Sequence, residues 1–567
     1  MIKALLREEI EGSVRALGLD VSALKIGFSL DVPTVEGFGD LSSNVALILA
    51  KTSGKNPKEL AEAIVGELRK GQNANVEKIE VAGAGFINFF FSSEYFRDAL
   101  AGVLKNERFG ENNSLAGQKV VIEYTDPNPF KEFHIGHLMT NTIGEAVSRL
   151  ASFSGAEVKR ACYQGDVGMH VAKAIFGMLA KEADLPAESE DLSVKAKFLG
   201  QCYAYGAKTE SGEDKKAIAE LNKKIYERSD EGVNRFYDLG RQWSLDYFET
   251  IYKRLGTKFD FYFFESATGP FGREIVEKGL SLGVFEKSDG AVIFPGEKYG
   301  LHTRVFINSE GLPTYEAKEL GLSKIKYDKF PYDKSVVVTG NDINEYFKVL
   351  LCAMEKVFPE LAKKTTHLGH GILRLPSGKM ASRTGDVITG GWLIDEVRKL
   401  VENKIAGSGR EGTLSDEAID QIAVGAIKYS ILKQGIGQNI IFDFDKSISF
   451  EGNSGPYLQY AHARCQSILE KAGGKTGELV LEADLPLFAR KLVRFTDVVE
   501  RATATYSPHL IVNYLTDLAG DFNSYYAATQ ILDGGSEEGH KLALVKALSR
   551  VLKNGLNLLG IEAPTKI

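Results

Sequence analysis

The stretch TDPNPFKEFHIGHLMTNTIG, residues 125–144, decides how the rest of the chain is interpreted. It contains His134 and His137, two of only nine histidines in 567 residues. KVVIEYTD, 119–126, precedes the loop with the pattern of a buried strand, and the residues from His137 onward have the apolar spacing of a helix. EVKRACYQ, 157–164, predicts another strand. A strand, a helix and a strand in this order form a βαβ unit of a parallel sheet.

The loop before the helix has the features of a nucleotide site. Open parallel sheets bind ligands beyond the carboxyl ends of their strands, and a helix start offers free N–H groups to an anion. Pro127 and Pro129 stiffen the loop, and Gly136 lets a ligand approach the backbone closely. His134 and His137 can donate hydrogen bonds to phosphate oxygens. No GxxxxGK[ST] phosphate loop occurs in the sequence.

Two other interpretations of the histidines remain open. They could only cap and pack the start of the helix, which is the commoner role of a lone HxxH spacing. A metal site has less support, because side chains three residues apart on a helix point about 300° apart. The sequence also offers no third ligand nearby.

Length and composition predict a multidomain globular protein. At about 150 residues per domain, the chain is long enough for three or four domains. The four cysteines form no CxxC pair, which argues against a zinc site or a disulfide framework and fits a reducing cytosol. No signal peptide and no apolar run of the ~18 residues needed to span a membrane is found, so a cytoplasmic protein is expected. The net charge of −7 leaves nucleic-acid binding to local patches.

The apolar patterns divide the chain into three regions. The first, 1–110, combines helical stripes with a strand at 78–92 and predicts a small α+β domain. The second, 111–405, contains the βαβ unit and predicts a Rossmann-like parallel sheet, interrupted by a helical insertion at about 185–300. The third, 406–567, has helical spacing throughout and predicts an α-helical domain.

The spelling His-Ile-Gly-His after PNPFKEF resembles the HIGH motif of class I aminoacyl-tRNA synthetases. GKMASRTGD, 378–386, resembles the KMSKS loop of that class and follows in the expected order. Several longer blocks resemble arginyl-tRNA synthetases in particular: GDLSSNVALILAK (39–51), IEYTDPNPFKEFHIGH (122–137), YQGDVGMHVAK (163–173), LPTYEAKELG (312–321) and EGNSGPYLQYAHAR (451–464). The resemblance covers essentially the whole chain, with the insertion its least distinctive part.

This resemblance implies an arginine–tRNA ligase. Such an enzyme activates L-arginine with ATP to arginyl-adenylate, releases diphosphate, and transfers arginine to the 3′ end of tRNA(Arg) with release of AMP. It implies an additional tRNA-contacting domain over 1–110, a catalytic domain over 111–405 and an anticodon-binding domain over 406–567. A monomer is also expected, as is Mg²⁺ with ATP, although no carboxylate pair in the sequence identifies itself as the metal's ligand.

By the same resemblance, His134 and His137 hold the ATP phosphates and stabilise the charge that develops on them. Ser382 replaces the second lysine of KMSKS, so we expect Lys131, just before HIGH, to compensate. Lys379 would assist as a fourth catalytic residue, although it and Arg383 could instead be solvated loop charges. The ATP-binding set implied by the resemblance is Pro127, Gly136, His137, Gly340, Asn341, Asp342, Met380 and Arg383.

Arginine recognition can be judged from chemistry as well. A guanidinium is planar and always charged, and it requires carboxylate partners. Glu123 near a strand end, and Glu319 one helical turn after Tyr315, are the candidate acids, although Glu123 could be an ordinary ion-pair partner. The family usually has aspartate where Glu319 stands, so the reach here is one methylene longer. The arginine-binding set implied is Glu123, Asn128, His134, Tyr315 and Glu319.

The C-terminal region is not basic, with 16 Lys and Arg against 19 Asp and Glu over 406–567. Anticodon recognition would therefore depend on a local face, where unpaired bases stack on aromatic rings and arginine. Tyr457, Tyr460 and Arg464 are the candidates, and packing within the domain explains them equally well.

Two other functions remain open. A class I synthetase for another amino acid is disfavoured by the set Glu123, Tyr315 and Glu319, which does not suit an apolar substrate. A tRNA-binding paralogue without catalysis is disfavoured by the intact HIGH motif and Lys131.

Overall fold

The structure is a computed structural model that describes residues 2–20, 27–33, 35, 37–208, 212–376, 388–407, 412–475, 477–480 and 485–567. The chain forms two compact units. One unit comprises 1–107, 474–493 and 530–547, and the other comprises 108–473, 494–529 and 548–567. Within the described ranges, no helix is both long and apolar enough to cross a membrane.

The first unit contains an antiparallel sheet of order β1-β2-β4-β3. Its strands are β1 (Leu30–Asp31), β2 (Leu41–Ser43), β3 (Val76–Ala82) and β4 (Phe86–Phe91). Helices of this unit are α1 (Ile2–Ala16), α2 (Val45–Ser53), α3 (Pro57–Leu68), α4 (Ser93–Lys105) and α18 (Leu487–Leu492). The single strand expected at 78–92 is therefore wrong. Gly83 and Gly85, at φ +55° and +124°, turn this segment into a hairpin.

The second unit contains a five-stranded parallel sheet of order β12-β11-β5-β6-β7, which confirms the Rossmann-like fold class. The strands are β5 (Lys119–Glu123), β6 (Glu157–Gln164), β7 (Phe261–Phe264), β11 (Lys334–Gly340) and β12 (Thr365–His370). From β5 the chain winds outward in one direction to β7, then returns to place β11 on the other side of β5. The carboxyl ends of β5 and β11 thus form the topological switch point, where such sheets bind ligands.

Two sequence expectations for this unit need correction. The strand expected at 119–126 ends at Glu123, because Thr125 and Asp126 have left-handed backbone angles that cannot continue a strand. The insertion expected at about 185–300 is helical over much of its length, in α7 (Leu192–Lys208), α8 (Gly212–Glu227), α9 (Glu231–Leu255) and α10 (Glu265–Ser281), but it also contains strands. The aromatic run between α9 and α10 is β7 of the main sheet. After α10 comes a small antiparallel sheet of β8 (Glu286–Ser288), β9 (Ala291–Phe294) and β10 (Arg304–Ile307).

Helices complete the second unit. Those around the sheet are α5 (Ile135–Phe153), α10, α11 (Tyr315–Lys329), α12 (Asn344–Val357) and α13 (Pro359–Lys364), whereas α6 (Met169–Ala180) packs against α7, α8 and α9. The C-terminal region is helical as expected, in α14 (Gly390–Gly407), α15 (Asp416–Leu432), α16 (Phe444–Ser447), α17 (Gly455–Lys471), α19 (Phe495–Ala504), α20 (His509–Ala528) and α21 (Glu538–Leu558). The part of α21 up to Ala547 belongs to the first unit. β13 (Leu373–Arg374) and β14 (Ile440–Ile441) pair in parallel.

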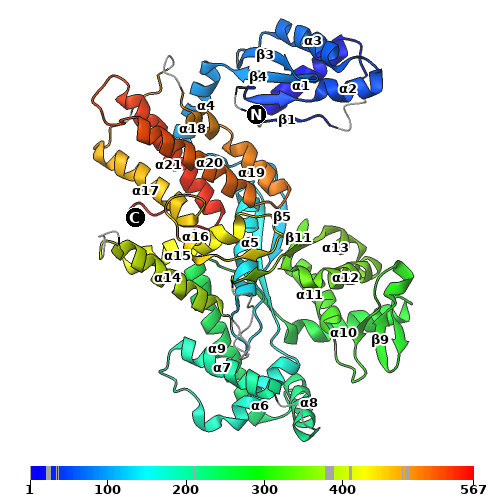
Figure 1. The fold of residues 1–567 in the computed structure, drawn as a ribbon. Coiled ribbons are helices and arrows are strands. Elements are labelled where there is room, and N and C mark those ends of the chain that lie inside the picture. Colours follow the sequence, from blue (N-terminus) through cyan, green and yellow to red (C-terminus); the bar gives the residue numbers. More distant parts are fainter. Residues whose placement is uncertain are drawn as a thin grey trace. The chain divides into compact units, whose positions relative to one another are not determined.

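The helix α5 is the central element of the second unit. Its expected apolar positions Leu138, Ile143, Val147 and Leu150 are all buried, at most 2% exposed. Figure 1 shows α5 beside β5 and β11, so its first turn lies near the switch point of the sheet.

Candidate active site

The loop between β5 and α5 has an unusual backbone. Thr125, Asp126 and Phe130 have φ values of +80°, +47° and +67°, although none is glycine. Such residues are strained and persist only where their surroundings hold them. Here Asn141 donates to the Thr125 hydroxyl at 3.0 Å, and the Phe130 N–H donates to Ser244 at 2.9 Å. The loop is therefore held in one shape beside the switch point, as a preorganised ligand site requires.

His134 and His137 form a reciprocal cap at the start of α5. The Nδ1 atom of His134 accepts from the N–H groups of Gly136 and His137 at 3.1 and 3.3 Å. The Nδ1 atom of His137 accepts from the His134 N–H at 3.2 Å, and the rings stack 3.5 Å apart. Capping is thus one function of the pair. Because each Nδ1 accepts a hydrogen bond, a neutral ring must carry its proton on Nε2, where it can be donated to a ligand.

Both rings are neutral at physiological pH. Burial, reinforced by the charge of Lys131, lowers the pKa of His134 to about 4. Burial, with His134 and Lys131, also lowers the pKa of His137 well below its ordinary value. The start of α5 therefore presents hydrogen-bond donors rather than two imidazolium charges. Lys131 supplies the cation next to them, half-buried and with its Nζ 4.9 Å from the Tyr203 ring.

Gly136 is required by this cap. A Cβ on Gly136 would lie 2.9 Å from the Nδ1 and Cε1 atoms of His134. Any side chain would push the imidazole out of its capping position. Close approach of a ligand is the role that the sequence predicts for this glycine, and the structure adds a contact within the protein.

A cluster of acids lies at the end of β5. Glu123, 2% exposed, forms an ion pair of 2.5 Å with Lys326 of α11. Glu319, also buried, forms no ion pair with any residue in the described part of the chain. Burial, followed by the nearby charge of Glu123, raises the pKa of Glu319 to about 8. Burial and Glu123 likewise raise the pKa of Asp126. One internal cation, Lys326, thus serves three carboxyl groups of this acid cluster, so the charge of a second cation could be balanced there.

Tyr315 and Asn128 both lie close to Glu265, whose charge also acts on Glu319 of the acid cluster. Tyr315 is the first residue of α11 and is 59% exposed, so its ring is accessible to a ligand. The side-chain oxygen of Asn128 lies where a Cβ on Gly165 would stand, which fixes it near the carboxyl end of β6. The structure therefore brings Glu123, Asn128, Tyr315 and Glu319 to the same edge of the sheet, although their order in the chain separates them.

The residues expected around the adenosine follow β11. Gly340 ends this strand, and Asn341 and Asp342 form a short 3-10 turn directly after it. Since β11 pairs with β5, they lie at the same edge of the sheet as Glu123. Pro127, on the loop from β5, is buried.

The KMASR loop falls at 377–387, so Lys379, Met380 and Arg383 lie outside the described residues. The chain immediately after it is described and is fixed to the start of α5. The Ile135 N–H donates to the carbonyl of Ile388 at 3.1 Å, and the Gly390 N–H donates to the carbonyl of Phe133 at 2.7 Å. The segment that follows the second motif is thus hydrogen-bonded to the segment that carries the first.

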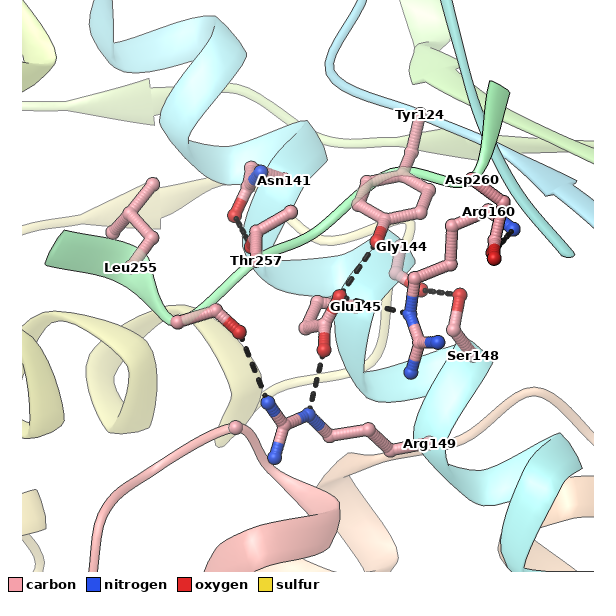
Figure 2. Close-up of polar contacts among 12 residues, drawn as sticks. Tyr124, Asn141, Gly144, Glu145, Ser148, Arg149, Arg160, Leu255, Thr257 and Asp260 are labelled. Atoms are coloured by element: carbon pink, nitrogen blue, oxygen red, sulfur yellow. Dashed lines mark hydrogen bonds and ion pairs between the residues drawn. The ribbon is translucent and has the colours of Figure 1, made fainter. Parts of the chain in front are cut away.

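A buried polar network anchors the middle of α5. Figure 2 shows Glu145 of α5 between Tyr124 and two arginines. The Tyr124 hydroxyl donates to Glu145 at 2.6 Å, and Arg149 and Arg160 lie 2.7 and 3.3 Å from its carboxylate. Burial opposes ionisation of Glu145, but the two arginines outweigh it and hold its pKa below the ordinary value. The network fixes the helix that carries the two histidines.

A buried lysine beside this network joins the ends of two helices. The Nζ atom of Lys428 donates to the carbonyls of Leu255 and Gly560, both at 2.6 Å. The Arg149 guanidinium likewise donates to the carbonyls of Gly256 and Asn557, at 3.1 and 3.0 Å. Basic groups at helix carboxyl termini are favourable because of the helix dipole. The turn after α21 is thereby held against α5, α9 and α15.

We expect Lys428→Met to lower the free energy of unfolding by about 2–5 kcal/mol, because it leaves two buried carbonyls without a donor. Urea unfolding followed by circular dichroism measures the change. Lys446→Met is the matched control, since the Lys446 side chain is 81% exposed and its loss should cost less than about 0.5 kcal/mol. Equal stability of the two variants would contradict this role for Lys428.

The three tRNA candidates lie together on α17. The Arg464 guanidinium stands 4.8 Å from the Tyr460 ring and 5.0 Å from the Tyr526 ring. It donates to Asn523 at 2.5 Å, and Asn523 donates to the Tyr457 hydroxyl at 2.9 Å. Tyr457, Tyr460 and Arg464 are half-buried, so they both pack and reach the surface. Their contact with tRNA stays a prediction.

Sequence reasoning missed Lys326 and the ion pair of Lys318 with Glu265, which is 2.6 Å long and buried. Lys326 stands two helical turns after Glu319. Helical spacing alone could therefore have predicted that the two side chains lie on the same face of one helix, in the acid cluster. No sequence pattern pointed to Glu265, which begins α10 after a short strand.

Three protein families match this chain in sequence. The one described as "tRNA synthetases class I (R), catalytic domain" matches residues 99–444. "Arginyl tRNA synthetase N terminal domain" matches residues 2–91, and "DALR anticodon binding domain" matches residues 458–567. Together they span most of the sequence.

Curated relatives agree with these matches. The arginine–tRNA ligase of Phocaeicola vulgatus is 30% identical over 96% of this chain and 98% of its own. That of Treponema denticola is 30% identical over 94% of this chain and 93% of its own. The solved structure of Thermus thermophilus arginyl-tRNA synthetase covers 100% of both chains with a TM-score of 0.82 at 24% identity, which supports the fold.

Proposed function

The chain belongs to the arginyl-tRNA synthetase family, and we propose that it joins L-arginine to tRNA(Arg) in the crevice between β5 and β11. The arginine carboxylate attacks the α-phosphate of ATP, forming arginyl-adenylate and releasing diphosphate. The 3′ hydroxyl of tRNA then attacks the activated carbonyl, and AMP leaves. Both steps depend on positioning and charge stabilisation rather than on a covalent enzyme intermediate.

The ATP phosphates lie at the start of α5 in this proposal. The Nε2–H groups of His134 and His137 donate to phosphate oxygens, and the helix dipole adds to the attraction. Lys131 supplies the positive charge, with Lys379 assisting from the second motif. Mg²⁺ accompanies ATP. The other proposed ATP contacts are Pro127, Gly136, Gly340, Asn341, Asp342, Met380 and Arg383.

Arginine specificity rests on one observation, the buried carboxyl of Glu319 without an ion pair in the described part of the chain. Lys326 already neutralises Glu123, so the pocket lacks one cation, which the substrate guanidinium supplies. Tyr315 closes the pocket over the substrate's side chain, and Asn128 and His134 bind its backbone groups. An apolar side chain would leave Glu319 unpaired, which is costly inside a protein.

The domain roles follow the same proposal. Residues 1–110 contact the tRNA, 111–405 catalyse both steps, and 406–567 bind the anticodon, with Tyr457, Tyr460 and Arg464 as the proposed contacts. The enzyme acts as a monomer in the cytoplasm.

Amino-acid-dependent ATP–pyrophosphate exchange tests this function. Each amino acid is supplied in turn, with and without tRNA(Arg). Exchange is expected when arginine is supplied and with no other amino acid. Exchange with a different amino acid would overturn the arginine assignment. The absence of any exchange would instead favour a tRNA-binding protein without catalysis.

We expect Lys131→Ala to slow adenylation more than Lys379→Ala does, because Ser382 stands where the usual phosphate-binding lysine would be. Loss of a cation that stabilises the charge developing on the ATP phosphates costs roughly 100-fold in rate. Pre-steady-state adenylate formation at saturating ATP, arginine and tRNA gives the two rates. The reverse order would reject Lys131 as the compensating residue.

A further inference from the structure

A buried histidine joins the first turns of α5 to the end of strand β12. His370 is the last residue of β12 and is 4% exposed. Its Nε2 atom lies 2.7 Å from the hydroxyl of Thr140, and its Nδ1 atom lies 2.7 Å from the carbonyl of Gly371. Thr140 stands on α5, one helical turn after Gly136. A single side chain thus connects two segments that are 230 residues apart in the sequence.

The surroundings decide which nitrogen of this ring carries the proton. The carbonyl of Gly371 can only accept a hydrogen bond, so Nδ1 of His370 is the donor. Burial lowers the pKa of His370, so the ring is neutral and its Nε2 atom is an acceptor. The Thr140 hydroxyl therefore donates to Nε2. Without this hydroxyl, a buried ring nitrogen would be left unsatisfied, which is costly inside a protein.

Thr140 extends this contact to the turn that carries the two histidines of the first motif. Its hydroxyl oxygen also lies 3.0 Å from the carbonyl of Gly136. The N–H of the same glycine donates to Nδ1 of His134 at 3.1 Å. A displacement of Thr140 would therefore move Gly136, and the reciprocal cap of His134 and His137 would move with it.

His370 is also fixed on the side of the sheet. It pairs with Gly340 in the register of β11 and β12, so it lies beside the segment proposed to face the adenosine. Asp342 of that segment is close enough to raise the pKa of His370, against the larger effect of burial. The next residue is held as well, because the Gly371 N–H donates to the carbonyl of Ile436 at 2.9 Å. The histidine thus contacts α5 from a fixed position.

We propose that His370 is a positioning residue for adenylation, which holds the phosphate-binding turn of α5 against the adenosine-binding strand ends through the hydroxyl of Thr140. The proposal rests on the proposed function, in which one ATP molecule contacts both segments at once. At 4% exposed, the ring acts through its neighbours rather than on the substrate. A misplacement of about 1 Å costs about 100-fold in rate when it reaches the reacting atoms, so one bond between the two segments is enough to affect kcat.

Single-turnover formation of arginyl-adenylate tests this role. His370→Asn keeps a donor to Gly371 but does not reach Thr140, and Thr140→Val removes the hydroxyl with little change of shape. We expect each variant to be about 10- to 100-fold slower than the parent, with the KM for arginine within about twofold. Thr140→Ser keeps the hydroxyl and should keep the parent rate.

The double variant separates the loss of a shared bond from general damage. Two side chains that act through one hydrogen bond lose it only once, so Thr140→Val combined with His370→Asn should be no slower than the slower single variant. Rate losses that multiply would mean that the two residues act independently, which would overturn the proposal. A parent-like rate in Thr140→Val would also overturn it, whether or not His370→Asn folds.

The contact between Thr339 and His367 provides a matched control. It is also a threonine–histidine contact of 2.7 Å and also involves β12, but it joins the neighbouring strands β11 and β12 and does not involve α5. Thr339→Val should therefore leave kcat unchanged. A loss of kcat as large as that of Thr140→Val would show that the rate responds to any loosened contact of β12, which would overturn the role of His370.

Pyrophosphate exchange by the parent distinguishes this failure from failure of the function. Arginine-dependent exchange by the parent, together with a parent-like rate in Thr140→Val, would overturn the role of His370 and leave the ligase assignment intact. A parent enzyme that gives no exchange with arginine would overturn both.

Discussion

A His134→Asn variant is expected to fold and to keep the start of α5, yet to form arginyl-adenylate about 100- to 1,000-fold more slowly than the parent. The asparagine oxygen can accept from the N–H groups of Gly136 and His137 as Nδ1 of the histidine does. The shorter side chain does not reach the position of Nε2, so the donor to the phosphate is lost. Single-turnover adenylate formation, with saturating arginine and tRNA, measures the rate.

His134→Ala is the control that separates capping from catalysis. It removes both the cap and the donor, so we expect the same loss of rate and an additional loss of stability of about 1 kcal/mol. Thermal unfolding of the two variants gives the difference. Wild-type adenylation by His134→Asn would show that the histidine only caps and packs the helix, which is the interpretation that the HxxH spacing alone favoured.

The site could be predicted from the sequence where local pattern and motif coincide. The apolar spacing of α5 and the preceding strand placed His134 and His137 at a helix start beyond a strand end. The reciprocal cap was not foreseen in detail, because a histidine at an N-cap position is not among the usual capping residues. It follows from the geometry of two rings three residues apart at a helix start.

The parts that could not be predicted depend on contacts between distant segments. Glu123 and Lys326 are 203 residues apart, and their ion pair exists because α11 packs beside β5. The left-handed angles of Thr125 and Phe130 run against their local preference and are imposed by bonds from α5 and α9. The strand β7 was hidden because four aromatic residues after a long helical region resemble a helix core as much as a strand.

The second large expected effect concerns Glu319, in the acid cluster at the end of β5. We expect Glu319→Gln to raise the KM for arginine by about 100-fold or more, because the guanidinium loses its one unpaired carboxylate partner. The amide keeps the size of the side chain, so the fold should not change. Aminoacylation at saturating ATP and tRNA gives kcat/KM for arginine. The KM for ATP serves as the internal control and should stay within about twofold.

The pH profile makes this prediction specific. Burial and Glu123 raise the pKa of Glu319 to about 8, so the free enzyme holds a proton there at neutral pH. The guanidinium binds the carboxylate form, and that proton must leave when arginine binds. In the parent, kcat/KM for arginine should therefore rise about tenfold per pH unit between pH 6 and 7.5 and level off above pH 8. Arginine binding therefore weakens as the pH falls below about 8 and recovers as the pH rises.

The two capping histidines should not contribute to the pH dependence of kcat/KM for arginine. Burial keeps the pKa of His134 near 4, so neither capping histidine changes its charge between pH 6 and 8, and kcat/KM for ATP should be flat there. Glu319→Gln cannot release a proton at this position, so its kcat/KM for arginine should be low and flat as well. A steep profile that survives in Glu319→Gln would mean that the substrate's guanidinium binds to a different carboxylate of the cluster, Asp126 or Glu123.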